Sequence, residues 1–104
     1  MARVIAEFSI IPIGTERTSL SNYVAEALTA LKEKGITFTV TPMSTIIEGD
    51  SLDDIFNAIK IAHEALIKLG VRRVVISINI DDRLDRPDRK PEEKVKSVKE
   101  KMRA

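Results

Sequence analysis

The sequence of 104 residues contains no cysteine and no tryptophan, and it has a single histidine, His63. Without cysteine there is no disulfide, no thiolate nucleophile and no cysteine-based zinc or iron–sulfur site. A metal site or triad built on His63 would need carboxylates or a second subunit. No catalytic-triad order, nucleotide-binding fingerprint or zinc spacing occurs. We therefore expect no catalytic residue, no metal site and no cofactor.

An excess of charge of one sign is also absent, because 17 Lys and Arg against 16 Asp and Glu leave a net charge of +1. Three Phe and one Tyr are too few for a platform on which nucleic-acid bases stack. No stretch reaches the roughly 18 apolar residues of a membrane span, and the first residues lack the order of a signal peptide. These features predict a cytoplasmic protein without nucleic acid or membrane as a partner.

The composition that remains is typical of a folded domain, with 43% hydrophobic and 32% charged residues. A chain of this length rarely divides into two cores, so we expect one domain over residues 1–104. High charge without cysteine or tryptophan is also compatible with a thermophile.

Alternating and helical patterns predict four strands and three helices. Strands are expected over residues 3–14, 36–41, 43–48 and 71–81, where apolar and polar residues alternate or β-branched residues gather. Helical spacing favours one helix that begins after Thr18 or Ser19 as N-cap and is ended by Gly35. It favours a second helix that begins after Ser51 as N-cap and is ended by Gly70. Pro91 can open a last helix with a narrow apolar stripe of Val95, Val98 and Met102.

This order predicts an α+β, ferredoxin-like β-α-β-β-α-β sandwich with a four-stranded antiparallel sheet and an extra C-terminal helix. Two helices cover only one face of such a sheet. The first and fourth strands are neighbours in this topology, so Glu7 and Ser9 should lie beside Ser77 and Asn79 on the other face. Apolar residues among them favour a subunit partner that covers this face.

A carboxylate inside such an interface is costly unless it is paired or hydrogen-bonded. Glu7 and Glu48 therefore either meet a donor from another subunit or serve a ligand, unless they are ordinary solvated strand residues. His63 is expected as a half-buried helix histidine. The charged residues of the segment 81–90 are expected to be solvated and to neutralise one another.

Four blocks in order, "AEFSIIPIGT", "TPMSTIIEG", "AHEALIKLGVRRVVISINIDDRLD" and "EEKVKSVKEKM", resemble the thiamine-binding-protein (YkoF-like) family of ferredoxin-like domains. The resemblance covers essentially the whole chain. It implies a non-enzymatic binder of thiamine or its hydroxymethylpyrimidine portion, assembled through its sheets into dimers or tetramers. The ligand-binding role then falls on Ser9, Ile11, Met43, Thr45, Glu48, Ser77 and Asn79, with Glu7 and Tyr23 as second choices.

Two other functions remain open at this point. A structural or regulatory homo-oligomer would use the polar row only for contacts between subunits and would bind no thiamine-related ligand. An enzyme acting on a related heterocycle would use Glu48 or Glu7 as general base, with His63 nearby.

Overall fold

Two long strands, β1 (Val4–Ile13) and β4 (Arg73–Asp82), pair antiparallel along their whole length in the computed structural model, which describes residues 2–16 and 20–102. On its other side β1 pairs with β3 (Thr45–Gly49), and β3 pairs with the short β2 (Phe38–Val40). The sheet order is therefore β2-β3-β1-β4, and all pairs are antiparallel.

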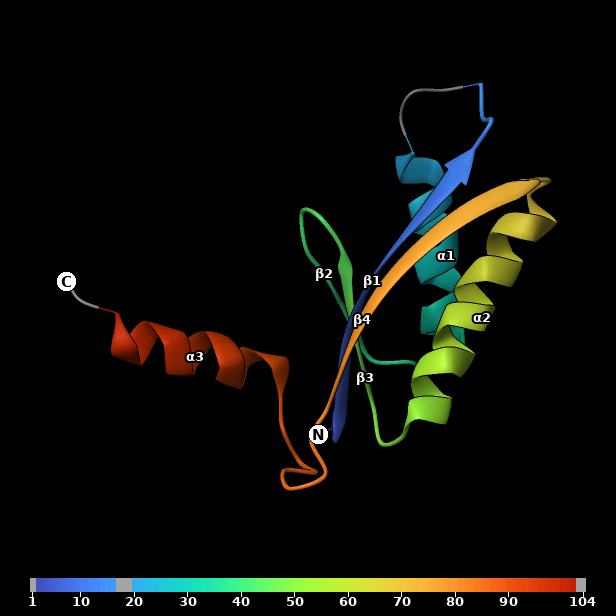
Figure 1. Ribbon diagram of the computed structural model, residues 1–104. Coiled ribbons are helices and arrows are strands. Elements are labelled where there is room, and N and C mark those ends of the chain that lie inside the picture. The colour runs from blue at the N-terminus through green and yellow to red at the C-terminus, as the bar shows by residue number, and fades with distance from the viewer. Residues whose placement is uncertain (1, 17–19, 103–104) are drawn as a thin grey trace.

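Helices α1 (Ser21–Glu33) and α2 (Leu52–Lys68) cover one face of this sheet, as Figure 1 shows. With α3 (Pro91–Lys101) following β4, the element order and the sheet order confirm the predicted ferredoxin-like fold with an extra C-terminal helix. The predicted strands exist, but β2 and β3 are shorter than expected. Residues 41–44 form the turn between them.

The core lies between the sheet and these two helices, because one side of each strand is apolar. The even-numbered residues of β1 point toward the helices, since successive side chains of a strand alternate between faces. They meet buried side chains of α1, α2 and β3, and the largest fully buried ones are Val4, Leu31, Ile47, Ile55 and Leu66.

The helix ends follow local hydrogen bonding. Ser51 caps α2 as predicted, because its Oγ accepts a hydrogen bond from the backbone N–H of Asp54 at 3.2 Å. The predicted cap of α1 is wrong: Leu20 is the N-cap residue and makes no side-chain cap, while Thr18 and Ser19 lie outside the described residues. Gly35 follows α1 with φ of 72°, a left-handed conformation that glycine adopts without strain.

The third helix stands apart from the rest of the molecule. It lies on the side of the sheet opposite α1 and α2 and runs away from it (Figure 1). None of its eleven residues is buried. In the part of the chain that the structure describes, no helix is long and apolar enough to cross a membrane.

Candidate functional site

The sheet face that α1 and α2 leave uncovered, called the open face below, carries a row of polar side chains between apolar ones. The strand register places Glu7 opposite Asn79 and Ser9 opposite Ser77, which confirms the predicted neighbours. The open face consists of Ile5, Glu7, Ser9, Ile11 and Ile13 of β1, Thr39 of β2, Ile46 and Glu48 of β3, and Arg73, Val75, Ser77, Asn79 and Asp81 of β4.

The Glu7 carboxylate is held from two sides. Asn79 Nδ2 donates a hydrogen bond to Oε1 at 2.8 Å, and Ser44 Oγ donates one to Oε2 at 3.1 Å. These two donors fix the carboxylate across the width of the sheet, because Asn79 belongs to β4 and Ser44 to the turn before β3. Its remaining acceptor capacity stays available on an exposed side chain.

The turn that supplies Ser44 is closed by its own hydrogen bonds. The backbone N–H of Thr41 donates to the carbonyl oxygen of Ser44 at 2.9 Å, and the Thr41 hydroxyl both donates to that carbonyl and accepts from the Ser44 N–H. This closed turn makes Ser44 a positioned donor. Sequence reasoning missed Ser44, because the turn has no Asn-Gly or Asp-Gly signal that would fix its geometry.

A cavity of about 360 Å³, called the hairpin cavity, lies between the turn, the end of β1 and the start of α1. Four of the predicted binding residues line it: Ser9, Ile11, Met43 and Thr45. Ser9 Oγ donates to the Met43 carbonyl at 3.4 Å. Thr45, opposite Phe8, is buried on the helix side of the sheet and reaches the cavity from there.

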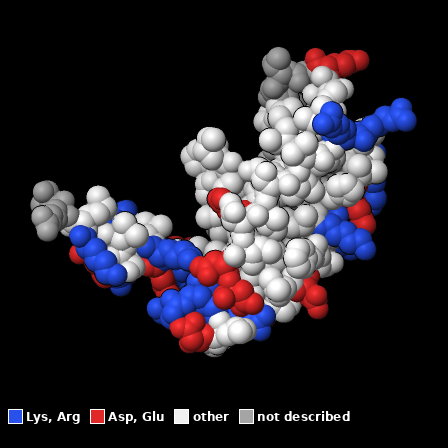
Figure 2. Space-filling view, viewed as in Figure 1, with Lys and Arg blue, Asp and Glu red and all other residues white. Residues whose placement is uncertain are grey.

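A second cavity of about 320 Å³, called the α3 cavity, lies between the open face and the first turn of α3. Its lining combines the carboxylate of Glu7, the amide of Asn79 and the Asp81–Lys94 ion pair with apolar walls that include Ile5, Ile46 and Val95. Figure 2 shows this side hollowed between α3 and the rest of the molecule, with charged side chains gathered where the two meet. A mainly apolar recess with a few convergent polar groups is typical of small-molecule sites.

The other predicted residues lie elsewhere. Ser77 is next to Ser9 on the open face, whereas Glu48 lies opposite Ile5 and lines neither cavity. Tyr23 is half-buried on α1 and packs against the core. His63 is half-buried on α2, as expected, and α2 covers the opposite side of the sheet from Glu7.

The charged segment after β4 is only partly the solvated loop that its composition predicts. Arg83 pairs with Asp85, and Arg86 lies 3.6 Å from Glu93, as self-neutralising surface charges. For Arg89 the prediction is wrong, since only 5% of this residue is exposed. It is buried because the segment folds back onto the N-terminal residues, where Ala2 and Arg89 exchange two backbone hydrogen bonds.

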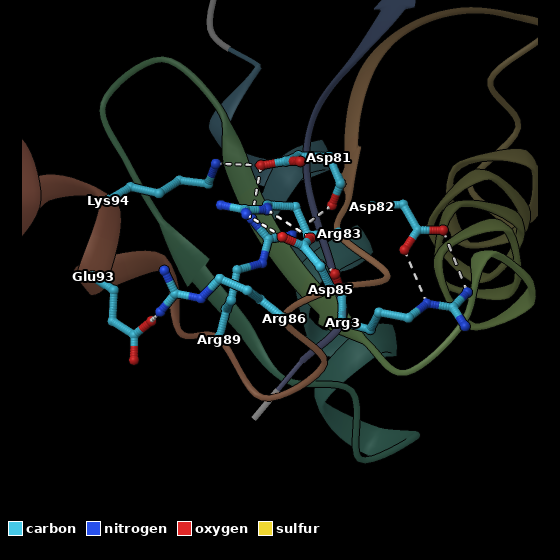
Figure 3. Close-up of polar contacts among 9 residues, drawn as sticks. All are labelled: Arg3, Asp81, Asp82, Arg83, Asp85, Arg86, Arg89, Glu93 and Lys94. Atoms are coloured by element: carbon cyan, nitrogen blue, oxygen red, sulfur yellow. Dashed lines mark hydrogen bonds and ion pairs between the residues drawn. The ribbon is translucent and has the colours of Figure 1, made fainter.

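The Arg89 guanidinium joins three segments (Figure 3). Nη1 donates to Asp81 Oδ2 at 2.8 Å, and Nη2 donates to the carbonyl oxygens of Arg3 at 2.9 Å and Asp81 at 3.0 Å. Asp81 also accepts a hydrogen bond from Lys94 in the first turn of α3. This cluster fixes where α3 begins, and thereby one wall of the α3 cavity.

The hydrogen bond from Lys94, followed by that from Arg89, lowers the pKa of Asp81 from 3.8 to about 2. The folded protein therefore holds the Asp81 proton less tightly than the unfolded chain. The resulting stabilisation is complete above about pH 4 and is lost as the pH falls through 2. Because the side chain is 40% exposed, solvent screening limits the effect to about 1 kcal/mol.

We expect the free energy of unfolding to fall less between pH 5 and pH 2 in Asp81→Asn than in the unchanged protein. Denaturant unfolding of both proteins at several pH values measures this difference. The other carboxylates are present in both proteins, so their contribution to the pH dependence cancels in the comparison. Equal losses in the two proteins would contradict the assignment to Asp81.

Comparisons with known proteins bear on the family and the fold of this chain. A family model described as thiamine-binding protein matches residues 6–99. A UPF0045 protein of Methanothermobacter thermautotrophicus is 46% identical over 99 residues, which cover 95% of this chain and 99% of that protein.

Two solved structures share the fold. That of a hypothetical protein of Methanocaldococcus jannaschii is 39% identical, with a TM-score of 0.80, and the match covers 96% of this chain and 99% of the other. That of a domain of unknown function from Bacillus cereus is 28% identical, with a TM-score of 0.75 and coverage of 90% and 88%.

Proposed function

Because the chain belongs to the thiamine-binding protein family, we propose that it binds thiamine or its hydroxymethylpyrimidine portion on the open face and performs no reaction on it. The observation that carries this proposal is the Glu7 carboxylate, which Asn79 and Ser44 hold at the edge of a largely apolar cavity. As expected from the sequence, a second subunit that packs on the open face of the sheet would complete the binding site.

The chemistry of an aminopyrimidine fits these groups. Its exocyclic amino group is a hydrogen-bond donor, its ring nitrogens are acceptors, and its flat ring packs on aliphatic side chains. In the α3 cavity, Glu7 would accept from the amino group while Ile5 and Ile46 contact the ring. We place the carboxylate role on Glu7 rather than Glu48, because Glu48 lines neither cavity.

The remaining predicted residues suit the rest of a larger ligand. Ser9 follows Glu7 by two residues on the same face of β1, about 7 Å along the strand, and lines the hairpin cavity with Ile11 and Met43. A molecule with two linked rings, such as thiamine, can therefore contact both cavities. Ser77 lies opposite Ser9 along this path.

Thermal unfolding with added thiamine, hydroxymethylpyrimidine or thiamine phosphate tests the proposal. A ligand that binds only the folded state at 100 times its Kd stabilises it by about 2.7 kcal/mol, so we expect the midpoint to rise by roughly 10 °C or more. The compound that acts at the lowest concentration identifies the recognised fragment. No rise with any of the three would contradict the proposal and favour a structural or regulatory oligomer.

A further inference from the structure

The two ends of the α3 cavity differ in charge. At one end, the Glu7 carboxylate has no cationic partner among the described residues. At the other end, the cavity is lined by Asp81 and Lys94. Asn79, which lies opposite Glu7, and Asp81 are two residues apart on the same face of β4, about 7 Å along the strand. The cavity therefore runs over a short distance from a hydrogen-bond acceptor to a group that contains a lysine.

The lysine end of the cavity keeps a net positive charge. Asp81 binds two cations, Lys94 and the buried Arg89, as Figure 3 shows. The carboxyl group is ionised at neutral pH, because its pKa is lowered to about 2 chiefly by the hydrogen bond from Lys94. One negative charge thus faces two positive ones. Glu92 and Glu93 belong to the same turn of α3, but neither lines the cavity. This end of the cavity therefore attracts an anionic group.

Lys94 is the cation that can contact such an anion directly. An ammonium group has three N–H donors, and within the described residues Asp81 is its only partner. The side chain is 50% exposed, so it can bind an anion and keep its contact with Asp81. The Arg89 guanidinium is buried, and its two Nη atoms already donate to Asp81 and to backbone carbonyl oxygens. Arg89 therefore contributes charge, whereas Lys94 contributes the contact.

We propose that this anion is a phosphate group on the hydroxymethyl oxygen of the pyrimidine, so the preferred ligand is the phosphate monoester of hydroxymethylpyrimidine. The inference rests on the proposed function for the position of the ring. The amino and hydroxymethyl groups are on adjacent ring carbons, so a ring whose amino group faces Glu7 can direct the phosphate along β4 toward Lys94. A phosphate monoester carries a charge of about −2 at neutral pH. In thiamine the same carbon carries a cationic ring, which Lys94 repels, so thiamine binds with its pyrimidine turned over and that carbon toward Ser9.

Titration calorimetry of the full chain with hydroxymethylpyrimidine and with its phosphate monoester tests the inference. We expect the monoester to bind about tenfold more tightly, because a charge-assisted contact is strong but Lys94 is half-exposed and shared with Asp81. Lys94→Met should remove this preference and leave the Kd of the unphosphorylated pyrimidine within about twofold, which also shows that the variant is folded. Lys94→Arg should keep the preference. Lys99→Met is the matched control, since it removes a positive charge from the same helix outside the cavity, and it should keep the preference as well.

The outcomes separate this inference from the proposed function. Equal Kd values for the two compounds in the unchanged protein would overturn the phosphate contact and leave the binding of the pyrimidine standing, whereas no binding of either compound would overturn both. A preference that survives in Lys94→Met, or one that Lys99→Met removes to the same degree, would also overturn the role of Lys94. Thiamine phosphate carries its phosphate beyond the second ring, so Lys94→Met should not change its affinity. A tenfold loss for thiamine phosphate would contradict the assigned orientation of the pyrimidine.

Discussion

Glu7→Gln is expected to weaken the binding of hydroxymethylpyrimidine by about tenfold to a hundredfold. A hydrogen bond to a charged group contributes about 1.5–3 kcal/mol, and every 1.4 kcal/mol is a factor of ten in Kd. The substitution keeps the shape of the side chain and removes its charge. Both carboxylate oxygens already accept a hydrogen bond, from Asn79 and from Ser44, so the amide of Gln places an N–H₂ group against one of these donors.

Titration calorimetry with hydroxymethylpyrimidine measures the change, and Glu48→Gln is the control. Both residues belong to the open face and both substitutions remove one negative charge, so a general electrostatic effect would appear in both variants. We expect a small change for Glu48→Gln, because Glu48 lines neither cavity. A larger loss in Glu48→Gln than in Glu7→Gln would transfer the carboxylate role to Glu48.

Asn79→Ala should produce a smaller loss in the same titration. It removes the 2.8 Å hydrogen bond that orients Glu7 but leaves the carboxylate and its contact with Ser44. Because Asn79 orients the carboxylate and the carboxylate itself remains, we expect only part of the energy of a hydrogen bond to be lost from binding, about 1 kcal/mol or roughly a fivefold change in Kd. An affinity equal to that of the unchanged protein would show that Asn79 does not position Glu7 for the ligand.

The open face was predictable because the alternation of a strand has a period of two and the topology fixes its neighbours. Once the first and fourth strands are adjacent, a hydrophobic match of Phe8 with Ile78 brings Glu7 to Asn79 and Ser9 to Ser77. One slip in register would place all of these residues on the wrong face. The strong pattern of both strands therefore specified half of the candidate site.

The other half depends on contacts that no local pattern encodes. Ser44 reaches Glu7 because the four-residue turn before β3 lies beside the middle of β1, and the sequence of this turn is not typical of one turn type. Arg89 is one of several alternating charges in its segment, and its burial depends on Ala2, which lies 87 positions earlier. Pairings over such distances are set by the folded chain, so the composition of the segment predicted only a solvated loop.

Arg89→Ala is expected to lower the free energy of unfolding by about 2–4 kcal/mol. The change leaves the carbonyl oxygens of Arg3 and Asp81 without their buried donor, and breaking a buried charged contact is costly. Lys94 still pairs with Asp81, and Arg89 Nε has no hydrogen-bond partner among the described residues, so we expect the lower end of this range. For a chain of this size that corresponds to a fall of roughly 10 °C in Tm.

Two further variants separate this buried role from a general effect of charge. Arg83→Ala removes an exposed arginine that pairs with Asp85, and such surface pairs contribute at most about 1 kcal/mol. Arg89→Lys keeps the charge, but one ammonium group does not reproduce the planar fork that reaches a carboxylate and two carbonyls, so it should restore little stability. All melts are compared at one protein concentration, because assembly itself shifts Tm. If Arg89→Ala melts like Arg83→Ala, the cluster at Asp81 does not hold the N-terminal residues, β4 and α3 together, and the fixed direction of α3 needs another cause.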